Sequence, residues 1–164
     1  MYRVYEESPH YKSHVDGVEM LAVLAKSDDD IDELLDSIDM TVDWPDVLLE
    51  RLEGALRRVD GAVGMLVKVE VDESCRGLGK GSGALDEYVK DIGSQSAVDM
   101  LFARVDNEQS TGIDILDFYV SKGFVPVHKC DGSLLMVNKG YREVFLDALL
   151  PRREASLESS GYEP

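Results

Sequence analysis

The hydrophobic pattern is clearest over residues 63–105. Apolar and polar residues alternate from residue 63 to residue 72, and β-branched side chains are frequent there, which predicts a strand. Beyond a glycine-rich stretch, apolar residues recur at helical spacing, namely Leu85, Tyr88, Val89 and Ile92. An apolar run at residues 98–105 predicts another strand. A strand, a helix and a strand in succession predict two neighbouring parallel strands joined by a right-handed crossover.

The N-terminal part is predicted to hold a strand, a second apolar element and two helices. Residues 2–6 fit a strand, and residues 18–25 fit a strand or a helix. Ser27 is a favourable cap for a helix whose apolar stripe is Ile31, Leu34, Leu35 and Ile38. The same capping logic at Asp43-Trp44-Pro45 predicts a helix with a stripe of Val47, Leu48, Leu52, Leu56 and Val59.

The C-terminal part is predicted to hold a helix, a hairpin and a last helix. Residues 111–122 fit a helix that Gly123 ends. The apolar runs FVPVHK and SLLMVNK flank Cys130-Asp131-Gly132, and Asp-Gly is a strong hairpin signal. The last helix is marked by Tyr141, Val144, Phe145, Ala148 and Leu149, and ends at Pro151. We therefore expect one α/β domain at residues 1–150, followed by a disordered tail at 151–164.

The chain is strongly acidic. It has 33 Asp and Glu against 17 Lys and Arg among 164 residues, a formal net charge of −16. Such a surface repels nucleic acid and favours a cationic partner, such as a polyamine, an aminoglycoside-like amine or a basic protein segment. Solubility alone explains the acidity equally well. Any anionic ligand must be held by local donors that overcome the global charge.

The sequence predicts neither a membrane segment nor a metal site. The N-terminus lacks the pattern of a secretory signal, and no apolar stretch approaches about 18 residues, so we expect a cytoplasmic protein. Cys75 and Cys130 lie far apart and share no metal-binding spacing, which favours reduced and inert thiols.

The most informative segment is the glycine loop, residues 76–83, which leads from the strand at 63–72 directly into the next helix. Backbone N–H groups at a helix start have no acceptor within the helix, and glycines let an anion approach without a Cβ in the way. Arg76 and Lys80 add local positive charge. The loop is therefore predicted to bind a phosphate group, although glycine clusters before helices also occur as plain tight turns.

Two common phosphate-binding motifs fit this loop poorly. A P-loop requires G-x-x-x-x-G-K-[ST], and no lysine of the loop has that register. A dinucleotide fingerprint requires G-x-G-x-x-G after an early strand. The glycines here are Gly77, Gly79, Gly81 and Gly83, whose spacing does not match.

Arg76-Gly77-Leu78-Gly79-Lys80-Gly81 instead resembles the R/Q-x-x-G-x-G/A signature of the Gcn5-related N-acetyltransferase (GNAT) superfamily. A second element, Tyr119-Val120-Ser121-Lys122-Gly123-Phe124, is similar to the family's Y-x-x-x-G-F sequence. The resemblance covers roughly residues 63–130. It implies a mixed, mostly antiparallel central sheet flanked by helices, with the strands at 63–72 and 98–105 splayed apart to hold acetyl-coenzyme A (acetyl-CoA).

The resemblance also implies roles for individual residues. The cofactor pyrophosphate is expected on the loop, and the strand before it contributes too; the cofactor-binding residues are then Val69, Val71, Arg76, Gly77, Leu78, Gly79, Lys80, Gly81 and Ser82. Asn107 resembles the asparagine that contacts the pantetheine arm, but it precedes Tyr119 by more residues than is usual in the family. The backbone N–H near Val71 is expected to stabilise the oxyanion.

The catalytic predictions are Tyr119 and Glu70. By resemblance, Tyr119 is the general acid that protonates the departing thiolate, and a phenol pKa near 10 against a thiol pKa near 8.5 suits this transfer. The alternative is that Tyr119 only continues the apolar helix stripe. The amine must lose a proton before it attacks, and Glu70 lies among valines, where burial would raise the pKa of a carboxyl. His128 and Asp99 are further candidates for the base.

These features predict an N-acetyltransferase that moves an acetyl group from acetyl-CoA to an amine by direct attack in a ternary complex. Two alternatives are a non-catalytic protein of the same fold, which binds coenzyme A or a partner through its acidic helices, and a nucleotide-binding module. The acceptor class stays open, and the apolar helix at 140–150 would suit a homodimer contact.

Overall fold

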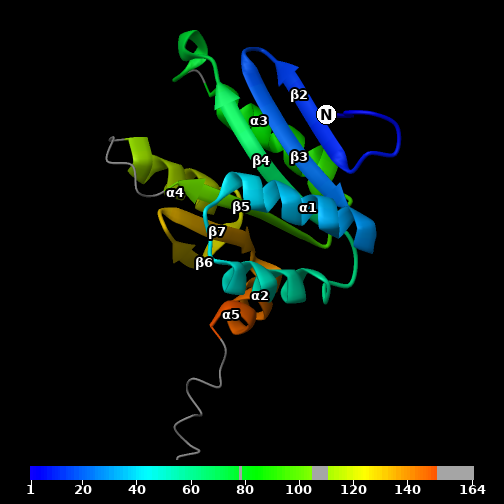
Figure 1. The fold of residues 1–164 in the computed structure, drawn as a ribbon. Helices are drawn as coiled ribbons and strands as arrows, with labels where there is room; N and C mark the ends of the chain where they lie inside the picture. Colours follow the sequence, from blue (N-terminus) through cyan, green and yellow to red (C-terminus); the bar gives the residue numbers. More distant parts are fainter. Residues whose placement is uncertain (78, 105–110, 151–164) are drawn as a thin grey trace, which may run out of the picture.

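The computed structural model describes residues 1–77, 79–104 and 111–150, so the expected tail at 151–164 lies outside the described residues. Within these ranges, one seven-stranded sheet has the order β1-β2-β3-β4-β5-β7-β6 (Figure 1). Only β4 and β5 pair in parallel. The strands are β1 (Tyr2–Arg3), β2 (His10–Val15), β3 (Val18–Ala25), β4 (Val63–Val71), β5 (Val98–Arg104), β6 (Phe124–Cys130) and β7 (Ser133–Asn138).

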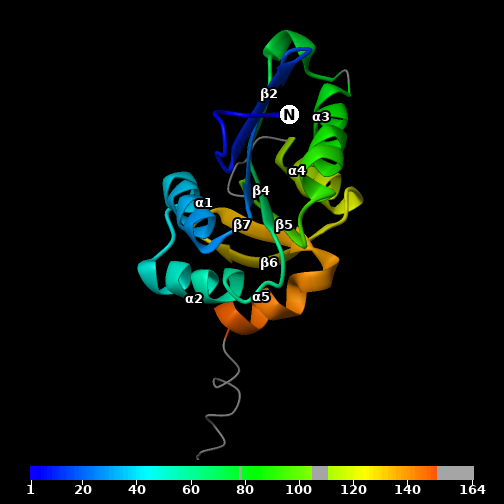
Figure 2. The same cartoon turned by 90° about the vertical axis from the view of Figure 1, so that its right-hand side faces the viewer.

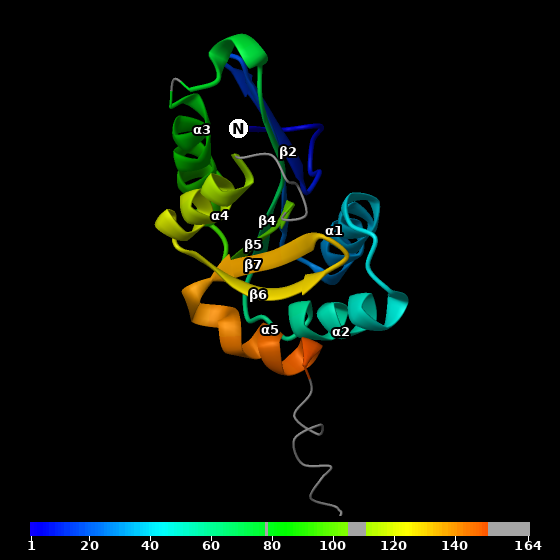
Figure 3. The same cartoon turned by 90° about the vertical axis from the view of Figure 1, so that its left-hand side faces the viewer.

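Helices cover both faces of the sheet. Figures 2 and 3 show α1 (Asp28–Thr41) and α2 (Asp46–Leu56) on one side and α3 (Lys80–Tyr88) and α4 (Thr111–Ser121) on the other. Helix α5 (Arg142–Leu149) shares a hydrophobic core with α1 and α2, and α3 and α4 pack on a second core. The predicted fold class, a mixed and mostly antiparallel sheet between helices, is confirmed.

The two N-terminal helices begin differently. Helix α1 has the predicted cap, because the Asp30 N–H donates to Ser27 Oγ at 3.2 Å. Helix α2 begins at Pro45 without a side-chain cap, so the expected capping by Asp43 is wrong. Val47, assigned to the apolar stripe of α2, is 51 % exposed, whereas Leu52 and Leu56 are buried as predicted.

The N-terminal strands differ most from the prediction. Only Tyr2–Arg3 of the predicted strand at 2–6 pairs, and β2 was missed. Its sequence, HYKSHV, buries Ser13 alone, so it carries no hydrophobic alternation. Asp16 and Gly17, at φ +55° and +79°, form the turn between β2 and β3, an Asp-Gly signal that was available in the sequence.

A buried polar cluster fixes the crossover between β4 and β5. The Tyr88 hydroxyl, at the end of α3, donates to Asp99 Oδ1 at 2.8 Å, and Ser96 Oγ donates to the same atom at 2.7 Å. Gly64 of β4 packs against this cluster, where a Cβ would lie 2.5 Å from Asp99 Oδ1. Burial raises the pKa of the Asp99 carboxyl, and the two hydrogen bonds offset this only in part.

Gly64→Ala is expected to lower the free energy of unfolding by about 1–3 kcal/mol, because the added methyl group overpacks this cluster. The matched control is Gly54→Ala in α2, whose Cβ would meet only Arg58 Nη2 at 3.9 Å. The control should raise stability by about 0.5–1 kcal/mol through helix propensity. Urea unfolding measures both, and equal effects of the two variants would contradict the close packing at Gly64.

Asp99→Asn is expected to stabilise the fold near neutral pH, since it keeps a carbonyl acceptor and removes a buried charge. A carboxyl whose folded pKa is raised contributes stability below its unfolded pKa of about 4 and loses it as pH rises through the folded value. The advantage of the variant should therefore shrink as pH falls toward about 4. Urea unfolding across this pH range checks it; a constant difference would rule out titration of Asp99 as its cause.

Candidate functional site

The parallel pairing of β4 and β5 is short. It joins Val63–Leu66 to Val98–Leu101 and stops there, although both strands continue. At the same point β4 has a bulge: Leu21 pairs with Lys68 and Ala22 with Leu66, which leaves Val67 as the extra residue. Beyond it, β4 pairs only with β3 and β5 only with β7 among the described residues. The splay, residues 67–71 facing 102–104, is therefore present as predicted.

A pocket of about 360 Å³ occupies the splay; we call it the splay pocket. Its lining comes from both faces of the sheet, with Thr41 and Val42 at the end of α1 on one side and Tyr119 of α4 on the other. The strands supply Leu66, Val67, Lys68 and Val69 from β4, Leu101, Phe102, Ala103 and Arg104 from β5, and Ser133 from β7. Ligand groups that enter the splay pocket from opposite faces of the sheet can thus come into contact at β4.

Tyr119 lies in this pocket, half-buried between two aromatic rings. Its ring centroid is 5.4 Å from that of Phe118 and 6.3 Å from that of Phe124, the latter in an edge-on arrangement. Burial raises the pKa of the phenol, so it stays protonated at neutral pH. Among the described residues its hydroxyl has no hydrogen-bond partner. It is a proton donor placed at the splay.

The glycine loop has the conformation that anion binding requires. Gly77 and Gly79 have φ of +80° and +76°, and Gly79 caps α3. The first helical hydrogen bond runs from Gly83 N to Gly79 O at 3.2 Å, so the N–H groups of Lys80, Gly81 and Ser82 have no acceptor within the helix. A Cβ at Gly77, Gly79 or Gly83 would meet nothing within 4 Å. The open loop and its N–H donors fit a pyrophosphate group.

Two cations lie beside the loop. Arg76 is exposed, and its Nε donates to Val71 O at 3.1 Å, at the end of β4. Lys122, at the end of α4, donates from Nζ to Ser82 Oγ at 2.9 Å and to Asp86 Oδ1 at 3.0 Å. Its ammonium group also lies 5.9 Å from the centroid of the Phe118 ring. Sequence reasoning missed Lys122, because no local pattern signals a contact with a helix 40 residues earlier.

The structure places the other predicted cofactor residues unevenly. Val69 lines the splay pocket and packs against the core under α3 and α4. Val71 ends β4, and a Cβ at Gly81 would lie 3.8 Å from Val71 Cγ2, so strand end and helix start are adjacent. Leu78 and Asn107 lie outside the described residues.

The burial expected for Glu70 is wrong. Its side chain is 60 % exposed and forms an ion pair with Lys68, with Glu70 Oε1 3.1 Å from Lys68 Nζ. Glu70 pairs with Glu19 and faces solvent, while Val69 points to the opposite face of the sheet, because successive side chains of a strand alternate. Lys68 Nζ also contacts Glu19 Oε1 at 2.9 Å, which forms an exposed triad.

The two other candidate bases lie away from the splay. Asp99 is held by Tyr88 and Ser96, in the part of β5 that still pairs with β4. His128 lies on the edge strand β6, its ring 5.5 Å from that of Trp44, and burial lowers the pKa of the imidazole. No carboxylate or imidazole among the described residues lines the splay pocket.

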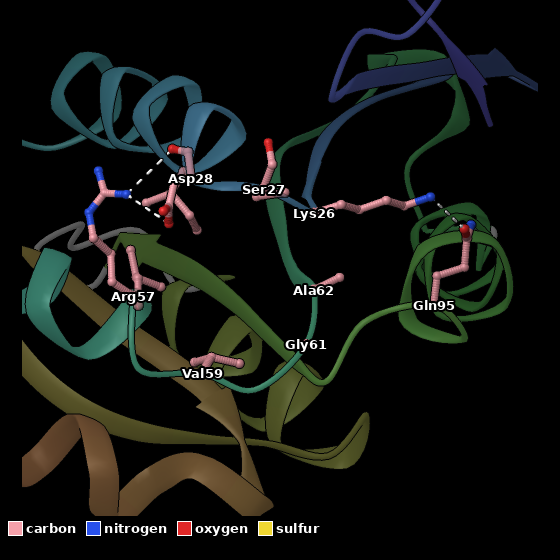
Figure 4. Close-up of a pocket in the computed structure, with 11 residues that line it drawn as sticks. Lys26, Ser27, Asp28, Arg57, Val59, Gly61, Ala62 and Gln95 are labelled. Carbon is pink, nitrogen blue, oxygen red and sulfur yellow. Dashed lines mark hydrogen bonds and ion pairs between the residues drawn. The ribbon is translucent and has the colours of Figure 1, made fainter.

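A pocket more voluminous than the splay pocket lies elsewhere in the described structure. It measures about 560 Å³ and lies between the start of α1, the end of α2 and the segment leading into β4 (Figure 4). Its Arg57 is neutralised by Asp28, Asp32 and Glu53, and Lys26 Nζ donates to Gln95 Oε1 at 3.4 Å. It contains neither glycine-loop residues nor Tyr119. We therefore place the candidate site at the smaller splay pocket.

Both cysteines are free, as predicted. Over the described ranges, no group of three His, Cys, Asp or Glu is placed to hold a metal ion. None of the helices in those ranges is long and apolar enough to cross a membrane.

No protein-family profile and no curated protein sequence matches the chain. Similar solved structures include PH1933 from Pyrococcus horikoshii OT3, at 19 % identity over 48 % of this chain and 46 % of that one, with a TM-score of 0.40. NAA60 from Arabidopsis thaliana, solved with acetyl-CoA, aligns at 15 % identity over 74 % and 64 %, with a TM-score of 0.44. A third, an acetyltransferase, aligns at 20 % identity over 73 % and 63 %, also with a TM-score of 0.44.

The chain thus spans less than two thirds of each of these three structures. With every TM-score below 0.5, the matches do not by themselves establish a family. The functional assignment depends on this chain's own splay, glycine loop and Tyr119.

Proposed function

We propose that this chain is an N-acetyltransferase that transfers the acetyl group of acetyl-CoA to an amine. The observation that carries the proposal is the junction of three features: an interrupted parallel strand pair, a helix start with free N–H donors directly after one of the two strands, and a protonated phenol in the pocket between them. This combination suits a long ligand with an anionic middle and a reactive end.

The phosphates of acetyl-CoA would bind at the glycine loop. The N–H groups of Lys80, Gly81 and Ser82 supply the donors, and Arg76 and Lys122 supply positive charge in an otherwise acidic protein. The extended pantetheine arm would lie along the free edge of β4, at Val69 and Val71, where backbone groups face no neighbouring strand. The roles of Leu78 and Asn107 stay predictions from sequence.

Each residue then has a defined part in the transfer. The amine nitrogen forms a bond to the acetyl carbonyl carbon, the carbon–sulfur bond breaks, and the sulfur leaves as a thiolate. A backbone N–H of the free β4 edge, near Val71, would hold the negative charge on the carbonyl oxygen. Tyr119 gives its proton to the thiolate, the amine proton passes to solvent, and solvent returns a proton to the Tyr119 phenolate. The reaction needs no metal and no covalent enzyme intermediate.

The predicted base of this mechanism is Glu70. Glu70 lies on the face of the sheet where α1 packs, opposite Tyr119, and it is exposed. As an exposed carboxylate, it would relay a proton from the amine to water. The absence of a carboxylate from the lining residues favours one alternative, a non-catalytic protein that binds coenzyme A. The effect of the Tyr119→Phe substitution distinguishes the catalytic protein from the non-catalytic one.

Tyr119→Phe is expected to lower kcat by roughly 100-fold or more, the usual contribution of a positioned general acid, and to leave the Kd of acetyl-CoA unchanged. Release of free thiol with an amine acceptor measures the rate. Tyr141→Phe removes a hydroxyl away from the splay pocket and should keep full activity. A Tyr119→Phe enzyme as fast as the wild type would refute the acid role. Acetyl-CoA binding without transfer to any amine would favour the non-catalytic alternative.

Lys122→Met is expected to weaken coenzyme A binding by about tenfold or more, because it removes a charged donor beside the loop. Lys122→Arg keeps the charge and should lose less. Pantetheine lacks the phosphates, so its affinity should not change. Calorimetry with both ligands checks this; equal losses would mean that Lys122 acts only through the packing of α4 on α3.

A further inference from the structure

A second, apolar pocket adjoins the splay pocket. It measures about 250 Å³ and is lined by Val4, His10, Tyr11, Leu21, Ala22, Ser37 and Val67; we call it the lateral pocket. Ser37 belongs to α1, and the remaining residues belong to β2, β3, β4 and the segment before β2. Ser37 of α1 and Val67, which packs against the core that includes α1, place the pocket next to α1, while Tyr11 and Ala22 also belong to the core under α3.

The lateral pocket and the splay pocket meet at one side chain. Val67, the bulge residue of β4, lines both. Helix α1 also borders both pockets: Ser37 lines the lateral pocket, and Thr41, about one helical turn later, lines the splay pocket. A molecule with its reactive group at the splay thus has room past Val67 on the α1 side.

The residues that line the lateral pocket disfavour a second ammonium group on the acceptor, in addition to the amine that reacts. Its lining is mainly aliphatic, and it includes no carboxylate among the described residues. His10 already contacts Glu33, with Nε2 3.0 Å from Oε1, outside the lining. An ammonium group placed there would lose its hydration and meet no carboxylate in the lining, only the neutral hydroxyl groups of Tyr11 and Ser37 as oxygen acceptors from side chains, which is costly. An apolar group would gain from leaving water.

We infer that the lateral pocket binds the apolar substituent of the acceptor, so that the substrate is a primary amine with a compact aryl or branched alkyl group on a short chain. This inference rests on the proposed acetyl transfer and adds the substrate class. An apolar cavity of about 150 Å³ holds benzene, so about 250 Å³ accommodates such a group. Polyamines, which the net charge alone favours, fit this lining poorly.

Leu21 is the position for a test. It is half-buried, lines the lateral pocket and pairs with Lys12 and Lys68 on neighbouring strands, so a polar side chain there is compatible with the sheet. Leu21→Gln makes the lining polar. Leu134→Gln is the matched control: Leu134 is a half-buried strand leucine that lines neither pocket.

The experiment compares phenethylamine with putrescine and spermidine as acceptors. The wild type should favour phenethylamine by at least about tenfold in kcat/KM, the scale on which apolar pockets discriminate. Leu21→Gln should reduce the kcat/KM for phenethylamine by about tenfold, mainly by raising KM. Leu134→Gln should leave the kcat/KM for phenethylamine unchanged. In calorimetry, phenethylamine should bind the coenzyme A complexes of the wild type and Leu134→Gln with similar affinity, and that of Leu21→Gln more weakly. This readout does not depend on turnover.

The thermal midpoint with acetyl-CoA separates the possible failures. If acetyl-CoA raises the midpoint of the wild type and of Leu21→Gln alike, yet polyamines are preferred or Leu21→Gln behaves as Leu134→Gln, the substrate class is wrong and the acetyl transfer stands. If acetyl-CoA changes no midpoint and no amine is acetylated, the proposed function fails and the inference fails with it.

Discussion

The pairing of β4 with β5 lasts for four residues and then stops, and the candidate site depends on this interruption. Backbone N–H and C=O groups must find partners, in the sheet, in a ligand or in water. The bulge at Val67 turns β4 away from β5 where their pairing ends. Up to that point, parallel pairing joins the two strands, and Tyr88 of α3 donates a hydrogen bond to Asp99 of β5 beside Gly64 of β4. Residues 63–66 and 98–101 therefore form a paired segment, and beyond it the facing edges of β4 and β5 are not paired with each other.

The positive groups near the candidate site oppose the negative net charge of the molecule. A net charge of −16 repels a phosphate-bearing ligand, so attraction must come from groups close to it. The start of α3 meets this need with N–H donors and no acidic residue in its first turn, whereas α1 begins with three aspartates. Lys122 adds a cation from α4 and thereby connects the helix of Tyr119 to the loop. Opposite faces of the sheet therefore suit different ligands.

Sequence reasoning succeeded where the pattern is local. The alternation in β4, the glycine loop, the spacing of Leu85 and Tyr88, and the Asp131-Gly132 turn each specify an element by themselves. Tyr119 was predicted separately, by the resemblance of residues 119–124 to a family motif; the structure places its side chain in the splay pocket, and its catalytic role stays a prediction. The β2 strand was missed because its exposed, polar sequence has no hydrophobic period.

The failures at the site have a different origin. The burial of Glu70 was inferred from its sequence neighbours Val69 and Val71, but adjacent side chains of a strand point to opposite faces, so those valines do not bury it. The Lys122–Ser82 contact and the lateral pocket arise only when distant segments pack together. Site residues on one continuous element could be predicted, whereas the relations between elements required the fold.

Amide hydrogen exchange with and without acetyl-CoA tests the central claim most directly, because it reads the free backbone groups themselves. The account predicts slower exchange at residues 80–82 and 67–71 when acetyl-CoA is added, with no change at residues 63–66, which are already paired. Unchanged exchange at both segments, or protection confined to residues 25–31 and 56–62 around the pocket of Figure 4, would contradict it.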